Sequence, residues 1–196
     1  MVAAVSVLPN GRADVFDHVP LLRLVPQDWP TRPLWVTGVR QHDLRRVVFG
    51  GHGGLRPALG DAVAASCAVP GYFSPVEIDG VRYVDGGVRS PTNADLLSDP
   101  GLVDVVIVVS PLSSSDGRPP AAQLLMRRYA ARKVRSEQAR LTAAGVRSVV
   151  LAPGPDVTRP FGAGIMAQER LAELTQAAFL DTGRQIAELG LAAVAR

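Results

Sequence analysis

The sequence predicts an α/β protein with an open, mostly parallel sheet flanked by helices, and three features support this class. Residues 104–110 form a continuous β-branched run, typical of a strand covered on both faces of a parallel sheet. Residues 57–70 and 121–144 carry apolar residues at the three-to-four spacing of amphipathic helices. Strands that alternate with helices favour right-handed crossovers between parallel strands.

The first predicted elements are two strands. Residues 34–39 follow the proline-rich segment 29–33, which is hostile to helix, and residues 45–49 follow a polar turn at 41–43. The short connection predicts a hairpin. Nothing before Leu34 provides the strand, glycine-rich turn and helix that usually open such a sheet, so we expect the fold to be incomplete at its N-terminal side.

A helix and a second hairpin follow. The small residues of 57–69 recur at helical spacing until Pro70 and Gly71 end the helix. Asp79 and Gly80 then separate two short apolar runs, which is a strong hairpin signal.

The C-terminal half continues with a strand at 104–110, a loop at 111–120 and a long helix capped by Gly145. One face of that helix is apolar, although Glu137 falls on it; its other members are Met126, Ala130, Val134 and Leu141. A strand at 146–151 comes next. The last predicted helix is defined by Leu171, Leu174, Ala178, Ile186 and Leu189. Because no repeat or linker divides the chain, we expect one domain over residues 1–196.

Composition agrees with a globular protein. The 196 residues are 47% hydrophobic, enough to bury a core. The net charge of +3 comes from scattered arginines balanced by 18 acidic residues, which argues against nucleic-acid binding. Cys67 is the only cysteine, so we expect a cytoplasmic protein without disulfides. No run approaches the roughly 18 apolar residues that span a bilayer, so membrane contact would be peripheral.

Basic residues gather on the predicted helix at 121–144: Arg127, Arg128, Arg132, Lys133, Arg135 and Arg140. They spread around more than half of its circumference, which is typical of a solvated helix face. Peripheral contact with anionic lipid head groups is the alternative.

One block of motifs, in a defined order along the chain, contains the candidate catalytic residues. A small-residue helix ending at Pro70, an aromatic pair and the Asp79-Gly80 hairpin lead to Asp85-Gly86-Gly87, with Asn93 downstream. A lone D-G-G is ordinary turn sequence. The ordered combination favours a functional interpretation.

This block resembles the second half of the patatin-like phospholipase family, in which the Asp of a D-G-G or D-G-A motif partners an upstream nucleophilic serine. Residues 33–36, 46–50, 104–110 and 178–183 also look like parts of bacterial members. The resemblance implies a lipid acyl hydrolase with an acyl-enzyme mechanism, no cofactor and no metal. Asp85 would be the base of a Ser-Asp dyad, Gly86 and Gly87 would shape its turn, and Asn93 would anchor the following loop.

The nucleophile of that family is not found in these 196 residues. No G-x-S-x-G occurs, and the glycine-rich oxyanion loop of the family is also absent. All three histidines precede Asp85, which excludes the order Ser, Asp or Glu, then His. Ser66 and Cys67 are better explained as small packed residues. We therefore expect half of a catalytic site, inactive alone; the alternative is a non-catalytic remnant or binding module.

The glycine run at 50–54 suggests a phosphate cradle, yet it satisfies neither G-x-G-x-x-G nor the P-loop pattern. A turn is the favoured interpretation, so we expect nucleotide to leave the melting temperature unchanged. If an elbow strand is missing, residues 34–39 and 104–109 would each lose a pairing neighbour, and the isolated chain would self-associate through exposed strand edges.

Overall fold

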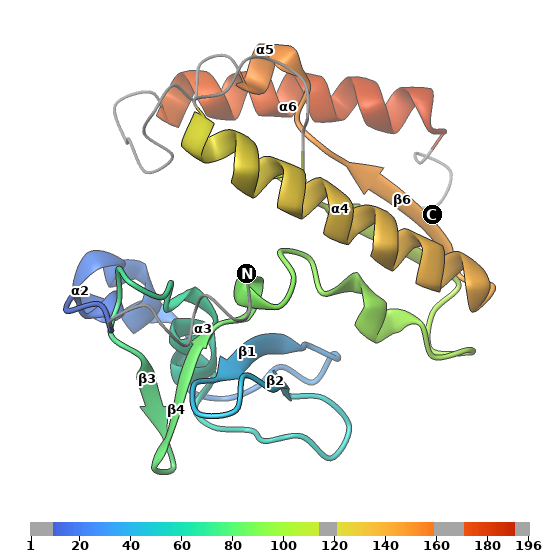
Figure 1. Cartoon of the computed structure of the whole chain (residues 1–196). Helices are drawn as coiled ribbons and strands as arrows, with labels where there is room; N and C mark the ends of the chain where they lie inside the picture. Colours follow the sequence, from blue (N-terminus) through green and yellow to red (C-terminus); the bar gives the residue numbers. More distant parts are fainter. Residues whose placement is uncertain (1–9, 114–120, 159–170, 191–196) are drawn as a thin grey trace. The chain divides into compact units, whose positions relative to one another are not determined.

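A computed structural model describes residues 10–113, 121–158 and 171–190 of the chain (Figure 1). The fold is mixed α/β with two open sheets. The chain divides into two compact units, Met1–Asn93 and Ala94–Arg196, and each is described by itself. Within the described ranges, no helix is long and apolar enough to cross a membrane.

The first unit is built on an antiparallel sheet with the strand order β2-β1-β4-β3. The strands are β1 (Val36–Arg40), β2 (Arg46–Phe49), β3 (Val76–Ile78) and β4 (Val81–Asp85). Both predicted hairpins are confirmed. The β3–β4 turn has φ of 50° at Asp79 and 73° at Gly80, the left-handed pair that a two-residue hairpin turn requires.

This sheet corrects two expectations. It is antiparallel throughout, so the prediction of a mostly parallel sheet is wrong. The short turns of the two hairpins allow only antiparallel pairing, since parallel strands need a long crossover. In addition, β1 pairs with β2 on one side and with β4 on the other, so residues 34–39 do not form an exposed edge.

A helix packs on one face of the sheet. Helix α3 (Leu59–Cys67) ends shortly before Pro70, as predicted. Its alanines Ala62 and Ala65 are fully buried against Phe49 and Tyr83, whose rings meet edge to face at 5.1 Å. Alanine allows the helix to approach the sheet closely, which leaves room for the two large rings.

Two short helices precede the sheet. Helix α2 (Val15–His18) begins at Asp14, whose Oδ1 accepts a hydrogen bond from the Phe16 backbone N–H at 2.7 Å, and η1 (Pro20–Leu24) follows. They contribute Val15 and Leu22 to a cluster with α3.

The second unit contains the only parallel pair of strands among the described residues. Strands β5 (Val105–Val109) and β6 (Arg147–Leu151) are parallel, and helix α4 (Ala121–Ala143) lies between them in sequence. The unit also contains η3 (Ala94–Leu97), α5 (Pro155–Thr158) and α6 (Leu171–Glu188). Its core cluster combines Val106 and Val108 with Leu141 and Val146.

The long helix ends as predicted. Gly145 has φ of +78°, and the Val146 N–H donates to the Leu141 carbonyl at 2.9 Å, which closes the last turn. Glu137 is only 4% exposed, and its Oε2 accepts a hydrogen bond from the Ala94 backbone N–H at 3.1 Å. Glu137 therefore binds the start of η3 from the apolar face of the helix.

Three predictions on this unit need correction. Arg127 is 3% exposed, so it does not belong to a solvated basic face, and burial lowers its pKa. Strand β5 is covered on one face only, because Ile107 is 49% and Val109 67% exposed. The predicted apolar face of α6 is at most half-buried, with Leu171 exposed. Residues 114–120 of the predicted loop lie outside the described residues.

Candidate functional site

Asp85 is the last residue of β4, where the strand gives way to η2 (Gly86–Val88). The register places it opposite Gly38 of β1. Its backbone N–H donates to the Ala68 carbonyl, directly after α3, at 3.0 Å. A neighbouring strand and the end of a helix therefore both fix the backbone that presents this carboxylate.

The carboxylate of Asp85 is half-buried and caps η2. Its Oδ1 accepts a hydrogen bond from the Gly87 N–H at 2.6 Å. Burial raises the pKa of Asp85, and the Gly87 N–H opposes this with a smaller lowering effect. A desolvated carboxylate with a raised pKa is a better proton acceptor than one in water, which suits a general base.

Gly86 is required by a close approach to β1. A Cβ atom at this position would lie 2.3 Å from Thr37 Oγ1 and 2.5 Å from the Thr37 carbonyl oxygen. At Gly87 a Cβ would lie 3.0 Å from Asp85 Oδ1. Any larger residue would therefore displace the turn or the carboxylate.

Asn93 is buried and adopts a left-handed conformation with φ of 50°. Its Nδ2 donates to the Ser90 carbonyl at 2.6 Å and lies 3.3 Å from Thr37 Oγ1. Its Oδ1 accepts a hydrogen bond from Arg46 Nη1 at 3.1 Å. These bonds connect the loop after η2 to β1 and β2. No sequence pattern indicated these roles: Ser90 is a local partner in the same loop, whereas Thr37 and Arg46 become neighbours only through the folding of the sheet.

Cys67 is a further neighbour of Asp85 that no sequence pattern indicated. Its thiol is partly buried, and burial followed by the negative charge of Asp85 raises its pKa. The Asp85 charge therefore acts at the last residue of α3. A raised pKa keeps the thiol protonated, which disfavours Cys67 as a nucleophile.

Two of the histidines have other neighbours. The His18 ring lies edge-on to Phe73 with centroids 5.7 Å apart, and His42 Nε2 lies 3.8 Å from the Asp43 carboxylate. Neither of these two contacts involves Asp85.

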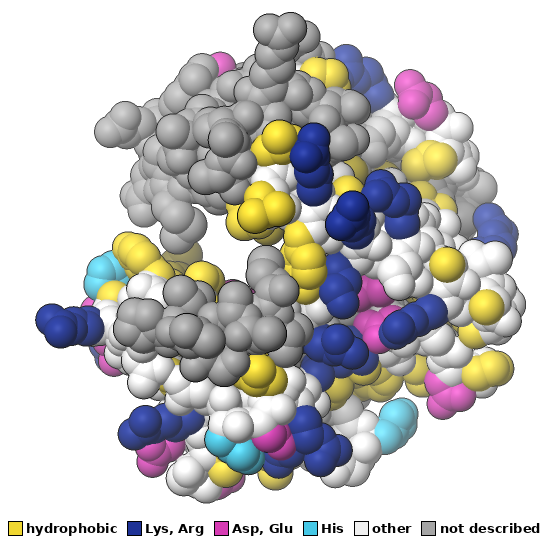
Figure 2. Space-filling model, in the orientation of Figure 1, with side chains coloured by type: hydrophobic (Ala, Val, Ile, Leu, Met, Phe, Trp, Pro, Cys, Tyr) yellow, Lys and Arg dark blue, Asp and Glu magenta, His cyan; other side chains and the backbone are white. Residues whose placement is uncertain are grey.

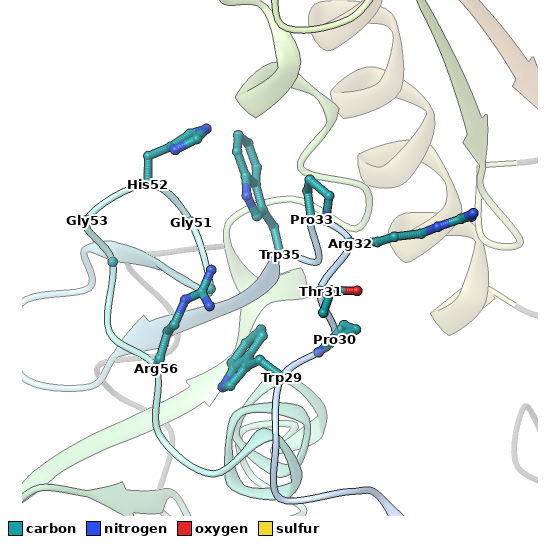
Figure 3. Close-up of a pocket in the computed structure, with 12 residues that line it drawn as sticks. Trp29, Pro30, Thr31, Arg32, Pro33, Trp35, Gly51, His52, Gly53 and Arg56 are labelled. Atoms are coloured by element: carbon teal, nitrogen blue, oxygen red, sulfur yellow. The ribbon is translucent and has the colours of Figure 1, made fainter.

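A pocket of about 560 Å³ lies elsewhere in the first unit (Figure 3). The glycine run 50–54 forms part of its wall, which the spacing of those glycines alone did not indicate. The other lining residues are Trp29, Pro30, Thr31, Arg32, Pro33, Trp35 and Arg56.

The half-buried carboxylate at a glycine-bounded strand end is consistent with the hydrolase class that the sequence suggests. Residues 15–98 match the family model described as patatin-like phospholipase. The matched segment contains the whole antiparallel sheet, α3 and the turn from Asp85 to Asn93. A comparison with curated proteins gave no match. The similarity to patatin-like phospholipases is therefore limited to residues 15–98, most of which lie in the first unit.

Proposed function

We propose that this chain carries the carboxylate half of a patatin-like Ser-Asp acyl hydrolase that acts on lipid acyl esters. Asp85 is the general base, Gly86 and Gly87 shape its turn, and Asn93 is a positioning residue. The observation that carries the proposal is the half-buried Asp85 carboxylate, with its raised pKa, inside the segment that matches the family. In this proposal both units belong to one domain over residues 1–196.

The chemistry assigned to Asp85 is proton transfer. Its carboxylate takes the proton of a serine hydroxyl while the serine oxygen attacks the acyl carbonyl. The tetrahedral intermediate then expels the alcohol, which receives the proton, and leaves an acyl-serine. In the second step Asp85 takes a proton from water, whose oxygen attacks the acyl-serine. The tetrahedral intermediate then releases the fatty acid, and the leaving serine oxygen takes the proton back from Asp85. The serine and the oxyanion donors come from polypeptide outside these 196 residues, so the chain alone is inactive.

The test uses a serine-directed fluorophosphonate. We expect no stoichiometric labelling of the 196-residue chain. If the coding sequence upstream of Met1 encodes an in-frame strand followed by G-x-S-x-G, the extended protein should label. Asp85→Asn should then slow labelling by about 10²- to 10⁴-fold, the usual contribution of a general base. The exposed Asp28→Asn is the matched control.

Two results would reject this function. Stoichiometric labelling of the 196-residue chain would show that it contains its own nucleophile. Labelling of an extended protein at an unchanged rate in Asp85→Asn would remove the base role while leaving the serine in place.

Membrane contact is a separate proposal on the second unit. With Arg127 buried, the candidates on α4 are Arg128, Arg132, Lys133 and Arg135, of which Lys133 is half-buried and the others are exposed, while Arg140 forms an ion pair with Asp95. Sedimentation with phosphatidylglycerol vesicles should be lost when the three exposed arginines are changed to Gln, because attraction to anionic lipid depends on these charges.

A second candidate function is a non-catalytic binding module, which the 560 Å³ pocket favours. If the extended protein is not labelled by the fluorophosphonate and the chain binds a ligand saturably, the binding module is the function that remains.

A further inference from the structure

The pocket of the first unit has two fixed aromatic walls. Trp29 Nε1 donates to the Pro57 carbonyl at 2.7 Å. Gly50 packs directly on the same indole, since a Cβ there would lie 2.3 Å from Trp29 Cζ3. Trp35 stands next to His52, with ring centroids 6.3 Å apart in an edge-to-face arrangement (Figure 3). Both indoles therefore present apolar surface whose position is set by named contacts.

The charge of the pocket is positive and uncompensated. Arg32, His52 and Arg56 line it, and no acidic residue does. In the described part of the chain, no carboxylate forms an ion pair with Arg32 or Arg56. The Arg56 guanidinium lies over the Trp29 ring, 6.0 Å from its centroid, whereas Arg32 extends away from both indoles (Figure 3). Arg56 is therefore the cation best placed to meet an anion beside Trp29, and His52 lies beside Trp35.

The glycine run forms a tight backbone loop on the wall of this pocket. The loop is closed by hydrogen bonds from the Gly50 N–H to the Leu55 carbonyl at 2.9 Å and from the Gly54 N–H to the Gly51 carbonyl at 3.0 Å. Gly50 has φ of +77°, and a Cβ at Gly54 would lie 2.6 Å from the Val48 carbonyl oxygen. Side chains are excluded at these positions, so the loop forms a wall of backbone around His52.

We propose that this pocket binds an amphiphilic organic anion. Its phosphate or carboxylate lies against Arg56 and His52, and its apolar part lies against Trp29 and Trp35. The volume of about 560 Å³ is within the range of about 300–1,000 Å³ that is usual for small-molecule sites. The proposal does not depend on Asp85.

Intrinsic fluorescence tests the proposal directly, since Trp29 and Trp35 are the only two tryptophans of the chain. The full chain is titrated with hexyl phosphate, inorganic phosphate, 1-hexanol and AMP. We expect a saturable change with hexyl phosphate at a Kd at least about tenfold lower than with the other three, because only hexyl phosphate combines the charge with the apolar chain.

Variants assign the binding to the pocket. Arg56→Gln should weaken hexyl phosphate binding by about tenfold or more, as expected for the loss of a charge-assisted hydrogen bond. Arg45→Gln removes the same charge at an exposed position in the β1–β2 turn and should leave the Kd unchanged. Asp85→Asn should also leave it unchanged, which separates this proposal from the hydrolase function. Thermal melting of each variant confirms that it folds.

Three outcomes would overturn the proposal: no saturable fluorescence change with hexyl phosphate, the same Kd in wild type and Arg56→Gln, or equal or tighter binding of AMP or inorganic phosphate. The last would identify a nucleotide or simple anion site instead of an amphiphile site.

Discussion

At Asp85 two local effects oppose each other, and their balance sets the chemistry of the site. Withdrawal from water raises the pKa of the carboxyl, and the single N–H of Gly87 compensates only in part. Asp43 has the opposite balance: desolvation raises the pKa of its carboxyl, but the Arg45 N–H and the Arg40 guanidinium together outweigh this effect and lower it. In the first unit, strong donors therefore hold the Asp43 carboxylate, whereas the Asp85 carboxylate is poorly stabilised. Asp85 is the better proton acceptor of the two.

The raised pKa of Asp85 predicts a pH dependence of stability. The folded state binds this proton more tightly than the unfolded chain, so the free energy of unfolding falls as pH rises from the unfolded pKa through the folded one. Asp85→Asn removes the free-energy cost of keeping a charged carboxylate out of water. The amide oxygen of the variant still accepts a hydrogen bond from the Gly87 N–H. We expect the variant to melt higher than wild type at pH 7, with the difference shrinking on acidification. Melting curves between pH 4 and pH 8 check this.

The exposed Asp28→Asn provides the comparison for that series. Its melting temperature should follow that of wild type at each pH. A lower melting temperature of Asp85→Asn at pH 7 would mean that the carboxylate stabilises the fold.

Replacing Gly86 by a larger residue is expected to overpack the turn and lower the stability of the fold. In Gly86→Ala the new Cβ meets Thr37 Oγ1 and backbone oxygen at 2.3 and 2.5 Å, so η2 must move away from β1. We expect a loss of about 1–3 kcal/mol, which corresponds to a drop of about 2–4 °C in melting temperature per kcal/mol. In the control Gly183→Ala, where no atom lies within 4 Å of the new Cβ in α6, stability should be unchanged or higher. An unchanged melting temperature in Gly86→Ala would show that the turn moves freely.

At the scale of elements, Glu137 illustrates why a charged residue occupies the apolar face of α4. Its carboxylate accepts from the buried Ala94 N–H and so fixes the start of η3. Helical periodicity places Glu137 on this face but gives no reason for its presence there, since the donor lies 43 residues away.

Substitution of Glu137 separates its hydrogen bond from its charge. Glu137→Gln keeps an acceptor for the Ala94 N–H, whereas Glu137→Ala leaves that N–H without this bond, at a cost of about 1–3 kcal/mol. We expect urea denaturation to rank the stabilities as wild type, then Gln, then Ala. If the Ala variant is as stable as the Gln variant, the hydrogen bond contributes nothing measurable.

Elements encoded by neighbouring residues were predictable from the sequence, and pairings between distant residues were not. The Asp79-Gly80 turn and the Gly145 cap depend on local conformation, and both are found in the structure. The pairing of β1 with β4 joins strands more than forty residues apart, which no local pattern specifies. The burial of Arg127 was missed for the same reason, since the position of a charge on a helix does not reveal what later covers it.

At the scale of the whole molecule, the order of motifs along the chain was sufficient to single out Asp85, while its environment was not predictable. Thr37, Arg46 and Cys67 surround this turn because strand pairing and the end of α3 bring them there. The space-filling view also shows hydrophobic side chains at the surface, among charged ones (Figure 2). Such side chains matter for association when they lie on an open strand.

Strand β5 has this property and predicts self-association. In the described part of the chain it pairs with β6 and with no other strand, so one of its edges carries unpaired backbone groups. Ile107 and Val109 are 49% and 67% exposed on the same strand. An unpaired edge with exposed apolar side chains is a template for pairing with another chain.

Sedimentation velocity should therefore detect concentration-dependent oligomers of the wild-type chain. Val109→Lys should shift the distribution towards monomer, because a charge on an open strand opposes edge-to-edge pairing, while the cost in stability stays below about 0.5 kcal/mol for an exposed position. Ser136→Lys, at an exposed position of α4 away from the strand, adds the same charge and should leave the oligomers in place. A wild-type chain that sediments as a single monomer at all concentrations would contradict the open-edge argument, as would equal dissociation by the two lysines, which would attribute association to net charge.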